Sequence, residues 1–373
     1  MYRISNFQIF CILMILVGPI AYLEVPKRLA VLTFNSGWLA ALLTIIPGIL
    51  IIMMFNYIIR KSQNPFPLLL EEYLGKIGGK LLAGIYVIVF LFIVSFTLSV
   101  FVNFIITNVL PDIPVSVLIG SFLFLSYFII KNGLENLARL SELIVFIGLP
   151  FSFGIVFLAA SQTLDVKNLL PLARVSINHL GLAVFSASAV LGRLFPILTI
   201  AYFSNYRPKV ANAAYWVLGF YIILIFSATV VTTLVYGSVA STLLTFPVFS
   251  VLRLIKIGEF LSNLDIFFIG IWIAGIIGTL TFFWFMACFT TQQIFNLKGY
   301  SFLAAPTSLI IAVVSLLISP NIVVLNIINE TLVVLVYFFF LIMIPIILFI
   351  LALFKPDQPI KSSSDSKGSS AIM

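Results

Sequence analysis

The sequence predicts an all-α, polytopic membrane protein with ten transmembrane helices. Hydrophobic residues make up 62% of the 373 residues and charged residues only 9%, a composition typical of chains whose main solvent is lipid. The apolar residues form long runs, and roughly 20 helical residues are enough to cross the hydrocarbon core of a bilayer. These runs are much longer than the strands of about 10 residues in a membrane β-barrel, and they lack the alternation that such strands show.

The ten predicted spans follow one another with short connections. They cover residues 5–34, 38–59, 81–109, 114–130, 140–160, 180–203, 212–236, 262–291, 302–319 and 331–354. Residues 64–82 and 246–265 mix apolar and charged residues at helical spacing, which predicts helices along the membrane interface, with ordinary loops as the alternative. Residues 1–354 are expected to form one transmembrane domain, and the Ser-rich residues 355–373 a disordered cytoplasmic tail.

The basic residues predict the orientation, because Lys and Arg favour the cytoplasmic side of a membrane. Ten spans place both termini on one side. Of the 20 Lys and Arg residues, 13 fall on that side, 6 fall on the other, and Arg193 lies within a span. Both termini are therefore predicted to be cytoplasmic. The net charge of +8 is explained by this topology, so a nucleic acid partner is not expected.

The first and sixth spans are each interrupted in the middle, by Gly18–Pro19 and by Gly192 with Pro196. Interruptions at corresponding places in two halves of a chain indicate the substrate site of a transporter. A cut helix leaves amides and carbonyls without partners, and this gap suits a small zwitterion such as an amino acid. Simple proline kinks are the alternative. The candidate ligand-binding residues at the two breaks are Val17, Gly18, Pro19, Leu191, Gly192 and Arg193.

Arg193 places a charge near the bilayer centre, which costs at least about 2.5 kcal/mol on insertion scales. It is therefore expected to face protein or water. Its partner is predicted to be Glu24, Glu142 or the carboxylate of a ligand, and these alternatives stay open. Glu142 has a second alternative, because Arg139 lies three residues before it on the same helix.

The third and eighth spans are expected to flank such a site, so their polar faces supply further candidates. Ser95 and Ser99 are four residues apart on the third span, and Thr281 and Phe285 are four apart on the eighth. Each pair therefore shares one helix face. Hydroxyl groups that only join neighbouring helices are the alternative.

Residues 132–151, residues 246–275 and the opening residues 4–10 resemble the B subunits of spore germinant receptors, a permease-like branch of the amino acid, polyamine and organocation transporter superfamily. The resemblance covers roughly residues 5–353. Residues that match recurrent patterns of that family are Gly133, Glu135, Arg139 and Glu142 after the fourth span, and Phe246, Pro247, Arg253, Asp265 and Trp272 before and inside the eighth. Members commonly have an acidic residue after the glycine of the sixth helix, and here that position is Arg193.

The resemblance implies a fold of two inverted five-helix repeats, about residues 5–160 and 180–354, with helices 1 and 6 broken. It implies a nutrient-sensing subunit that binds a small germinant, expected to be an amino acid, between those helices and so triggers germination. It also implies a place in the spore inner membrane or bacterial cell membrane, beside a larger membrane subunit and a lipoprotein subunit. A secondary amino acid or polyamine transporter is the alternative function, because binding and alternating access use the same fold.

An enzyme is not expected. The chain has one histidine, His179, and two cysteines, Cys11 and Cys288, which are far apart in the sequence. No cluster with metal-ligand spacing is present, so neither catalytic residues, a metal nor a cofactor is predicted.

The charge bias leads to a prediction about labelling. Asn64→Cys should react only with thiol reagents that cross the membrane, whereas Val166→Cys should react with impermeant reagents added from outside, because the basic residues place residue 64 in the cytoplasm. Labelling intact cells with both reagents measures this, and the parent chain controls for reaction at Cys11 and Cys288. The reverse pattern would rule out the ten-helix map.

Overall fold

The computed structural model describes residues 4–160, 164–170, 175–255, 264–318 and 322–354, and these residues are almost entirely helical. The α-helices are α1 Asn6–Leu23, α2 Val25–Thr33, α3 Gly37–Leu43, α4 Ile45–Lys61, α5 Phe66–Asn108, α6 Val115–Lys131, α7 Leu134–Ala160, α8 Ile177–Leu191, α9 Ile197–Ile200, α10 Val210–Leu243, α11 Pro247–Leu254, α12 Leu264–Phe295, α13 Ala304–Ile318, α14 Ile322–Ile328, α15 Val334–Phe338 and α16 Ile344–Leu353. The predicted all-α class is confirmed. The predicted disordered tail, residues 355–373, lies outside the described residues.

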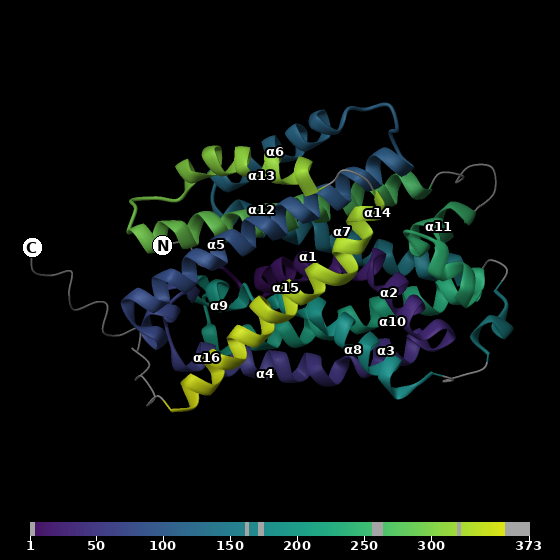
Figure 1. Cartoon of the computed structure of the whole chain (residues 1–373), viewed down its shortest axis with the longest axis horizontal. Coiled ribbons are helices and arrows are strands. Elements are labelled where there is room, and N and C mark those ends of the chain that lie inside the picture. Colours follow the sequence, from purple (N-terminus) through teal and green to yellow (C-terminus); the bar gives the residue numbers. More distant parts are fainter. Residues whose placement is uncertain (1–3, 161–163, 171–174, 256–263, 319–321, 355–373) are drawn as a thin grey trace, which may run out of the picture.

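Membrane-spanning length is reached by nine apolar helical segments among the described residues. Val115–Lys131, an apolar helix of 17 residues, adds another. Together they occupy the positions of the predicted spans, which confirms a multi-pass membrane protein. The long helices run along one axis of the molecule, with α9 and α16 toward one end and α2, α3 and α11 toward the other (Figure 1).

The first span differs from the prediction at its break. Helix α1 continues through Gly18 and Pro19, and it ends at Leu23. The regular α-helix is interrupted only at Glu24, after which α2 begins. The prediction of an unwound gap at Gly18–Pro19 was therefore wrong, because flanking residues keep helical backbone while a proline removes only one amide donor.

The sixth span is interrupted where the sequence predicts it. Helix α8 ends at Leu191, Gly192–Leu194 form a 3₁₀ turn, and α9 starts after Pro196. The amide of Phe195 donates to the carbonyl of Gly192 over 2.8 Å. Such tight turns satisfy backbone groups locally, so this interruption leaves fewer free groups than an open break would.

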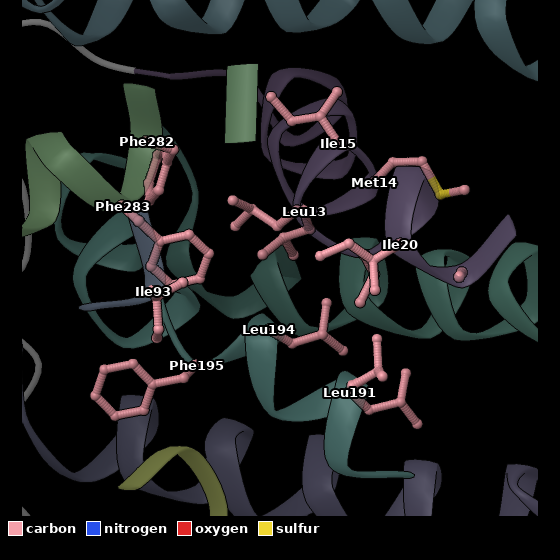
Figure 2. Packing of buried hydrophobic residues seen from close by; sticks show 14 of the residues in the cluster. Leu13, Met14, Ile15, Ile20, Ile93, Leu191, Leu194, Phe195, Phe282 and Phe283 are labelled. Atoms are coloured by element: carbon pink, nitrogen blue, oxygen red, sulfur yellow. The ribbon is translucent and has the colours of Figure 1, made fainter. Parts of the chain in front are cut away.

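Phe195 anchors the interrupted sixth span in the core. Its ring lies 4.4 Å from that of Phe66 and 5.2 Å from that of Tyr86, centre to centre. The Tyr86 hydroxyl donates to the carbonyl of Phe340 over 2.6 Å. Figure 2 shows residues of α1, the sixth span, α5 and α12 meeting in one apolar cluster. Aromatic pairs at these separations add to the stability that burial provides.

The two predicted interfacial stretches take different forms. Residues 66–74 form the first turns of α5, which changes direction at Gly75 (φ 75°, ψ 167°). In the second stretch, α11 buries Val248, Phe249 and Leu252, and the Phe249 ring lies 5.0 Å from that of Phe104. Residues 247–254 therefore form a helix and not an ordinary loop, with one face packed into the protein. The place of α11 at the membrane interface stays a prediction. Residues 256–263 lie outside the described part of the chain.

Gly75 leads to a stability prediction with an internal control. Gly75→Ala should destabilise the fold by about 1–3 kcal/mol, because its backbone lies in a region that essentially only glycine adopts. Gly84→Ala, in the same helix and with equally open space around an added methyl group, should be neutral or stabilising by up to about 1 kcal/mol. Thermal unfolding of the two purified variants measures the difference. Equal melting temperatures would contradict the prediction.

Candidate functional site

Helix α1 carries a stretch, residues 15–19, in which three carbonyl groups, those of Ile15, Leu16 and Pro19, accept hydrogen bonds from side chains of other segments. We call it the proline segment. Pro19 has no amide hydrogen, so the carbonyl of Ile15 loses the donor that an α-helix normally supplies from four residues ahead. The hydroxyl of Thr279 on α12 donates to that carbonyl over 2.5 Å. The indole of Trp272 on the same helix donates to the carbonyl of Pro19 over 3.2 Å.

Arg193 supplies a third donor to the proline segment. It is fully buried, and its Nε donates to the carbonyl of Leu16 over 2.8 Å. Its Nη1 donates to the hydroxyl of Tyr337 on α15, and the guanidinium lies 4.9 Å from the ring centre of Phe283. Its Nη2 has no hydrogen-bond partner among the described residues.

The predicted ion pairs of Arg193 with Glu24 or Glu142 are not formed among the described residues. Glu24 instead accepts from Arg28 over 3.1 Å and from the side-chain amide of Asn329 over 2.8 Å. Arg28 also donates to the side-chain oxygen of Asn329 over 2.6 Å. Arg193 therefore remains a charge held by neutral partners and aromatic rings, which is a weaker compensation than a carboxylate provides.

The Glu24–Arg28–Asn329 cluster joins the beginning of α2 to the tenth span. Arg28 is only 6% exposed, and the cluster borders a small cavity of about 20 Å³, enough for one water molecule or so. Asn329 begins a π-helical turn, Asn329–Val333, and a second one follows at Phe339–Met343. Such turns are rare in helices and frequent at functional sites.

A second cavity, of about 70 Å³, lies beside Gly18 and Pro19. It is several times the roughly 10–15 Å³ that one water needs. Its walls come from α1, α7, α10 and α12, and they are formed by Met14, Ile15, Gly18, Pro19, Tyr22, Ile144, Val145, Gly148, Leu149, Phe151, Ser152, Leu224, Phe268, Ile271, Trp272 and Gly275. Polar groups are few, which is typical of sites for small, mostly apolar ligands.

The predicted site residues divide between several places. Gly18 and Pro19 line the cavity, while Val17 and Leu191 are buried in the core. Gly192 packs against the tenth span, since a methyl group added there would lie 3.0 Å from the Cβ of Leu341. Of this set, only Arg193 has a side chain that hydrogen-bonds to the proline segment.

The third-span candidates belong to a contact between helices. The Ser99 hydroxyl donates to the carbonyl of Ser315 on α13 over 2.8 Å, and the Ser315 hydroxyl donates to the carbonyl of Ser95 over 3.1 Å. These bonds join α5 to α13, so Ser99 has the alternative role that hydroxyl groups play between membrane helices. Ser95 contributes only its carbonyl, because its hydroxyl has no hydrogen-bond partner among the described residues.

The eighth-span candidates lie on a different face of α12 from the proline-segment contacts. Thr281 donates to the carbonyl of Ile277 in its own helix, and the Phe285 ring packs 5.1 Å from that of Tyr300. The residues that reach the α1 carbonyl and Arg193 are Thr279 and Phe283, two positions earlier. Two residues rotate a helix face by about 200°, so a shift of two positions selects the opposite face.

Sequence reasoning also missed Tyr337 and Asn329. Tyr337 is an isolated polar residue within the apolar tenth span, and that isolation is the signal that could have identified it. Asn329 lies just before the predicted span, next to Glu330 and Thr331, so it carries no such signal. Trp272 had been noticed only through the family resemblance. Arg139, the possible neighbour of Glu142, pairs instead with Glu135 over 2.7 Å.

The two buried arginines lead to opposite predictions in double-mutant experiments. Arg28→Gln should destabilise the fold by roughly 3–5 kcal/mol by leaving Glu24 without its cation, and Glu24→Gln in the same chain should restore much of the loss. Arg193→Gln should also lower the amount of folded protein, but neither Glu24→Gln nor Glu142→Gln should restore it. The yield of monodisperse protein after detergent extraction measures each case. Rescue of Arg193→Gln by either glutamate change would show an ion pair that the structure lacks.

Comparisons with known proteins bear on the family and the fold. The family model described as "Spore germination protein" matches residues 3–323. Spore germination protein KB of Bacillus subtilis (strain 168) is 27% identical over 377 residues, which cover 97% of this chain and 98% of that protein. Spore germination protein GerQB of Bacillus cereus is 24% identical over 173 residues, covering 46% of this chain and 48% of that protein.

The fold is shared with a solved structure. The crystal structure of MhsT in complex with L-phenylalanine matches with a TM-score of 0.64 at 14% identity, covering 94% of this chain and 100% of that one. The apolar helices, the interrupted sixth span and the family match over residues 3–323 lead to one conclusion: the chain belongs to the family of spore germination permeases.

Proposed function

We propose that this protein is the nutrient-sensing membrane subunit of a spore germinant receptor and binds a small germinant of the amino acid class. The observation that carries the proposal is the cavity beside Gly18 and Pro19. It lies against the proline segment, whose carbonyl groups of Ile15 and Pro19 are bonded by the side chains of Thr279 and Trp272. The proposed role is binding, and no catalytic step is part of it.

The cavity suits two groups of a small amino acid, its ammonium group and its hydrocarbon side chain. An ammonium group donates hydrogen bonds, and the carbonyl groups of the proline segment are acceptors whose present partners come from side chains. A hydrogen bond from an ammonium group is charge-assisted and contributes about 1.5–3 kcal/mol, more than the roughly 1 kcal/mol of the neutral bond that it would replace. The apolar walls from α7 and α12 suit a hydrocarbon side chain. L-Phenylalanine bound to the fold neighbour MhsT supports the amino acid class.

Binding at the proline segment would act on several helices together. Thr279 and Trp272 hold the segment to α12, and Arg193 holds it to the sixth and tenth spans. A ligand that bonds to one of these carbonyl groups replaces its present donor. It then favours conformations in which the helix that carries the donor, such as α12, has moved away from the segment. It shifts a population of states only by its difference in affinity between them.

The family supports the setting of this role. The relatives of Bacillus subtilis and Bacillus cereus are named spore germination proteins, so we place this chain in the spore inner membrane with both termini cytoplasmic. We also propose that it works beside a larger membrane subunit and a lipoprotein subunit.

Transport of the germinant is the second candidate, and the fold shared with MhsT favours it. Uptake of radiolabelled amino acid into proteoliposomes separates the two functions. Saturable binding without uptake supports a receptor, whereas uptake that follows the same amino acid preference supports a permease.

A Gly18 variant tests the proposed site. Gly18→Leu should abolish amino-acid-dependent stabilisation of the purified protein, because its side chain would extend into the cavity. A ligand at 100 times its Kd stabilises by about 2.7 kcal/mol, so the lost shift is measurable by thermal unfolding against a panel of amino acids. Gly120→Leu, at an open position on α6, is the control and should keep the shift. An unchanged shift in folded Gly18→Leu would remove the proline segment from the site.

A further inference from the structure

A long groove opens on the outer side of the bundle between α1, α7 and α10. Its volume is about 960 Å³, at the upper end of the range for small-molecule sites. It is lined by Asn6, Phe7, Phe10, Val145, Phe146, Ile147, Leu149, Pro150, Phe153, Lys209, Asn212, Ala213, Trp216 and Phe220. This set contains six aromatic residues, one cation and no carboxylate.

The polar residues gather where α1 and α10 begin. Asn6 is the first residue of α1, and Lys209 and Asn212 lie at the start of α10. The amide of Ile4 donates to the carbonyl of Phe203 over 2.8 Å, and the amide of Asn205 donates to the carbonyl of Ile4 over 3.0 Å. These bonds hold the two helix beginnings together. Two helix N-termini add partial positive charge to that of Lys209.

The rest of the groove is aromatic and apolar. The Phe10 and Phe220 rings lie 5.7 Å apart, and Phe153 lies 6.3 Å from Phe220. Trp216, two turns into α10, is 67% exposed and Phe146 is 78% exposed. From Lys209 to Phe220 the α10 wall rises about 16 Å at 1.5 Å per residue, which is about half the thickness of a hydrocarbon core.

We propose that this groove binds one anionic phospholipid, with its phosphate beside Lys209 and one acyl chain along the aromatic wall. The charge distribution favours this occupant, because a positive end without a carboxylate complements an anionic head group and the remaining wall offers only apolar contacts. The length of the wall matches one leaflet. The predicted topology places the Lys209 end at the cytoplasmic surface, where anionic lipids attract basic residues.

The Lys209 ammonium is positioned for this contact. It lies 5.4 Å from the ring centre of Tyr206, and its side chain is exposed. The neighbouring Arg207 is not available in the same way, because its guanidinium donates to the carbonyl of Ser62 over 2.9 Å. Lys209 is therefore the residue expected to distinguish anionic from neutral head groups.

Native mass spectrometry of the full chain with added phosphatidylglycerol or phosphatidylcholine tests the proposal. We expect one lipid per chain, with phosphatidylglycerol retained about fivefold better, roughly the effect of one lysine near an anionic surface. Lys209→Gln should remove that preference, while Lys131→Gln on α6, an exposed lysine outside the groove, should keep it.

A second pair of variants tests the contribution of the apolar wall to lipid binding. Trp216→Ala should lower the retention of both lipids, whereas Phe124→Ala, at a comparably exposed aromatic residue on α6, should not. Equal retention of both lipids by the parent chain, or loss of preference in Lys131→Gln alone, would overturn the proposal. So would displacement of the lipid by a copurified membrane subunit, because the groove would then be a protein interface. None of these readouts depends on germinant binding.

Discussion

The hydrogen bonds made to the proline segment of α1 are the constraint on which the centre of the molecule depends. A backbone carbonyl at membrane depth must be satisfied by protein or by water in a cavity. Pro19 removes the helical donor for Ile15, and Thr279 replaces it. Arg193 and Trp272 bond the next carbonyl groups along the segment. One helix is thereby fixed to the sixth, eighth and tenth spans by directional bonds within a core that packs mainly through non-directional apolar contacts.

Arginine suits this position through the geometry of its guanidinium group. Its donors point in fixed directions in one plane, so one side chain reaches both the Leu16 carbonyl and the Tyr337 hydroxyl. The flat faces are left for rings, and Phe283 lies 4.9 Å away. A lysine would offer a compact charge with strong hydration, which is costlier to bury. Nη2, which has no hydrogen-bond partner in the described part of the chain, adds to the cost of placing this charge in the core.

The sequence predicted most of the fold because bilayer thickness requires long apolar helices, and it located the interruption at Gly192–Pro196 because only a few residue types break a helix. The partners were harder to predict. The pair Thr281 and Phe285 has the same four-residue spacing as Thr279 and Phe283, which make the contacts. The spacing does not show which of the two faces of the helix meets α1. Tyr337 was missed because periodicity gives no signal in a uniformly apolar span, where all faces look alike. The four-residue spacing of Glu24 and Arg28 is visible in the sequence and is typical of an ion pair on one helix face. From the sequence, Glu24 was instead considered as a partner of the distant Arg193.

Helix α7 lies between the two cavities proposed as binding sites. Val145 and Leu149 line both the cavity at the proline segment and the outer groove. Packing against α7 is therefore interrupted on both sides. Only 22% of an apolar stretch of 18 residues in α7 is buried, against 67% for α1. Pro150 removes one of its internal hydrogen bonds as well. A densely packed helix cannot move without losing contacts. Helix α7 has space on both sides, so a shift of this helix costs few contacts. A ligand at the proline segment and a lipid in the groove would then press on the same two side chains from opposite sides, which makes their binding free energies interdependent.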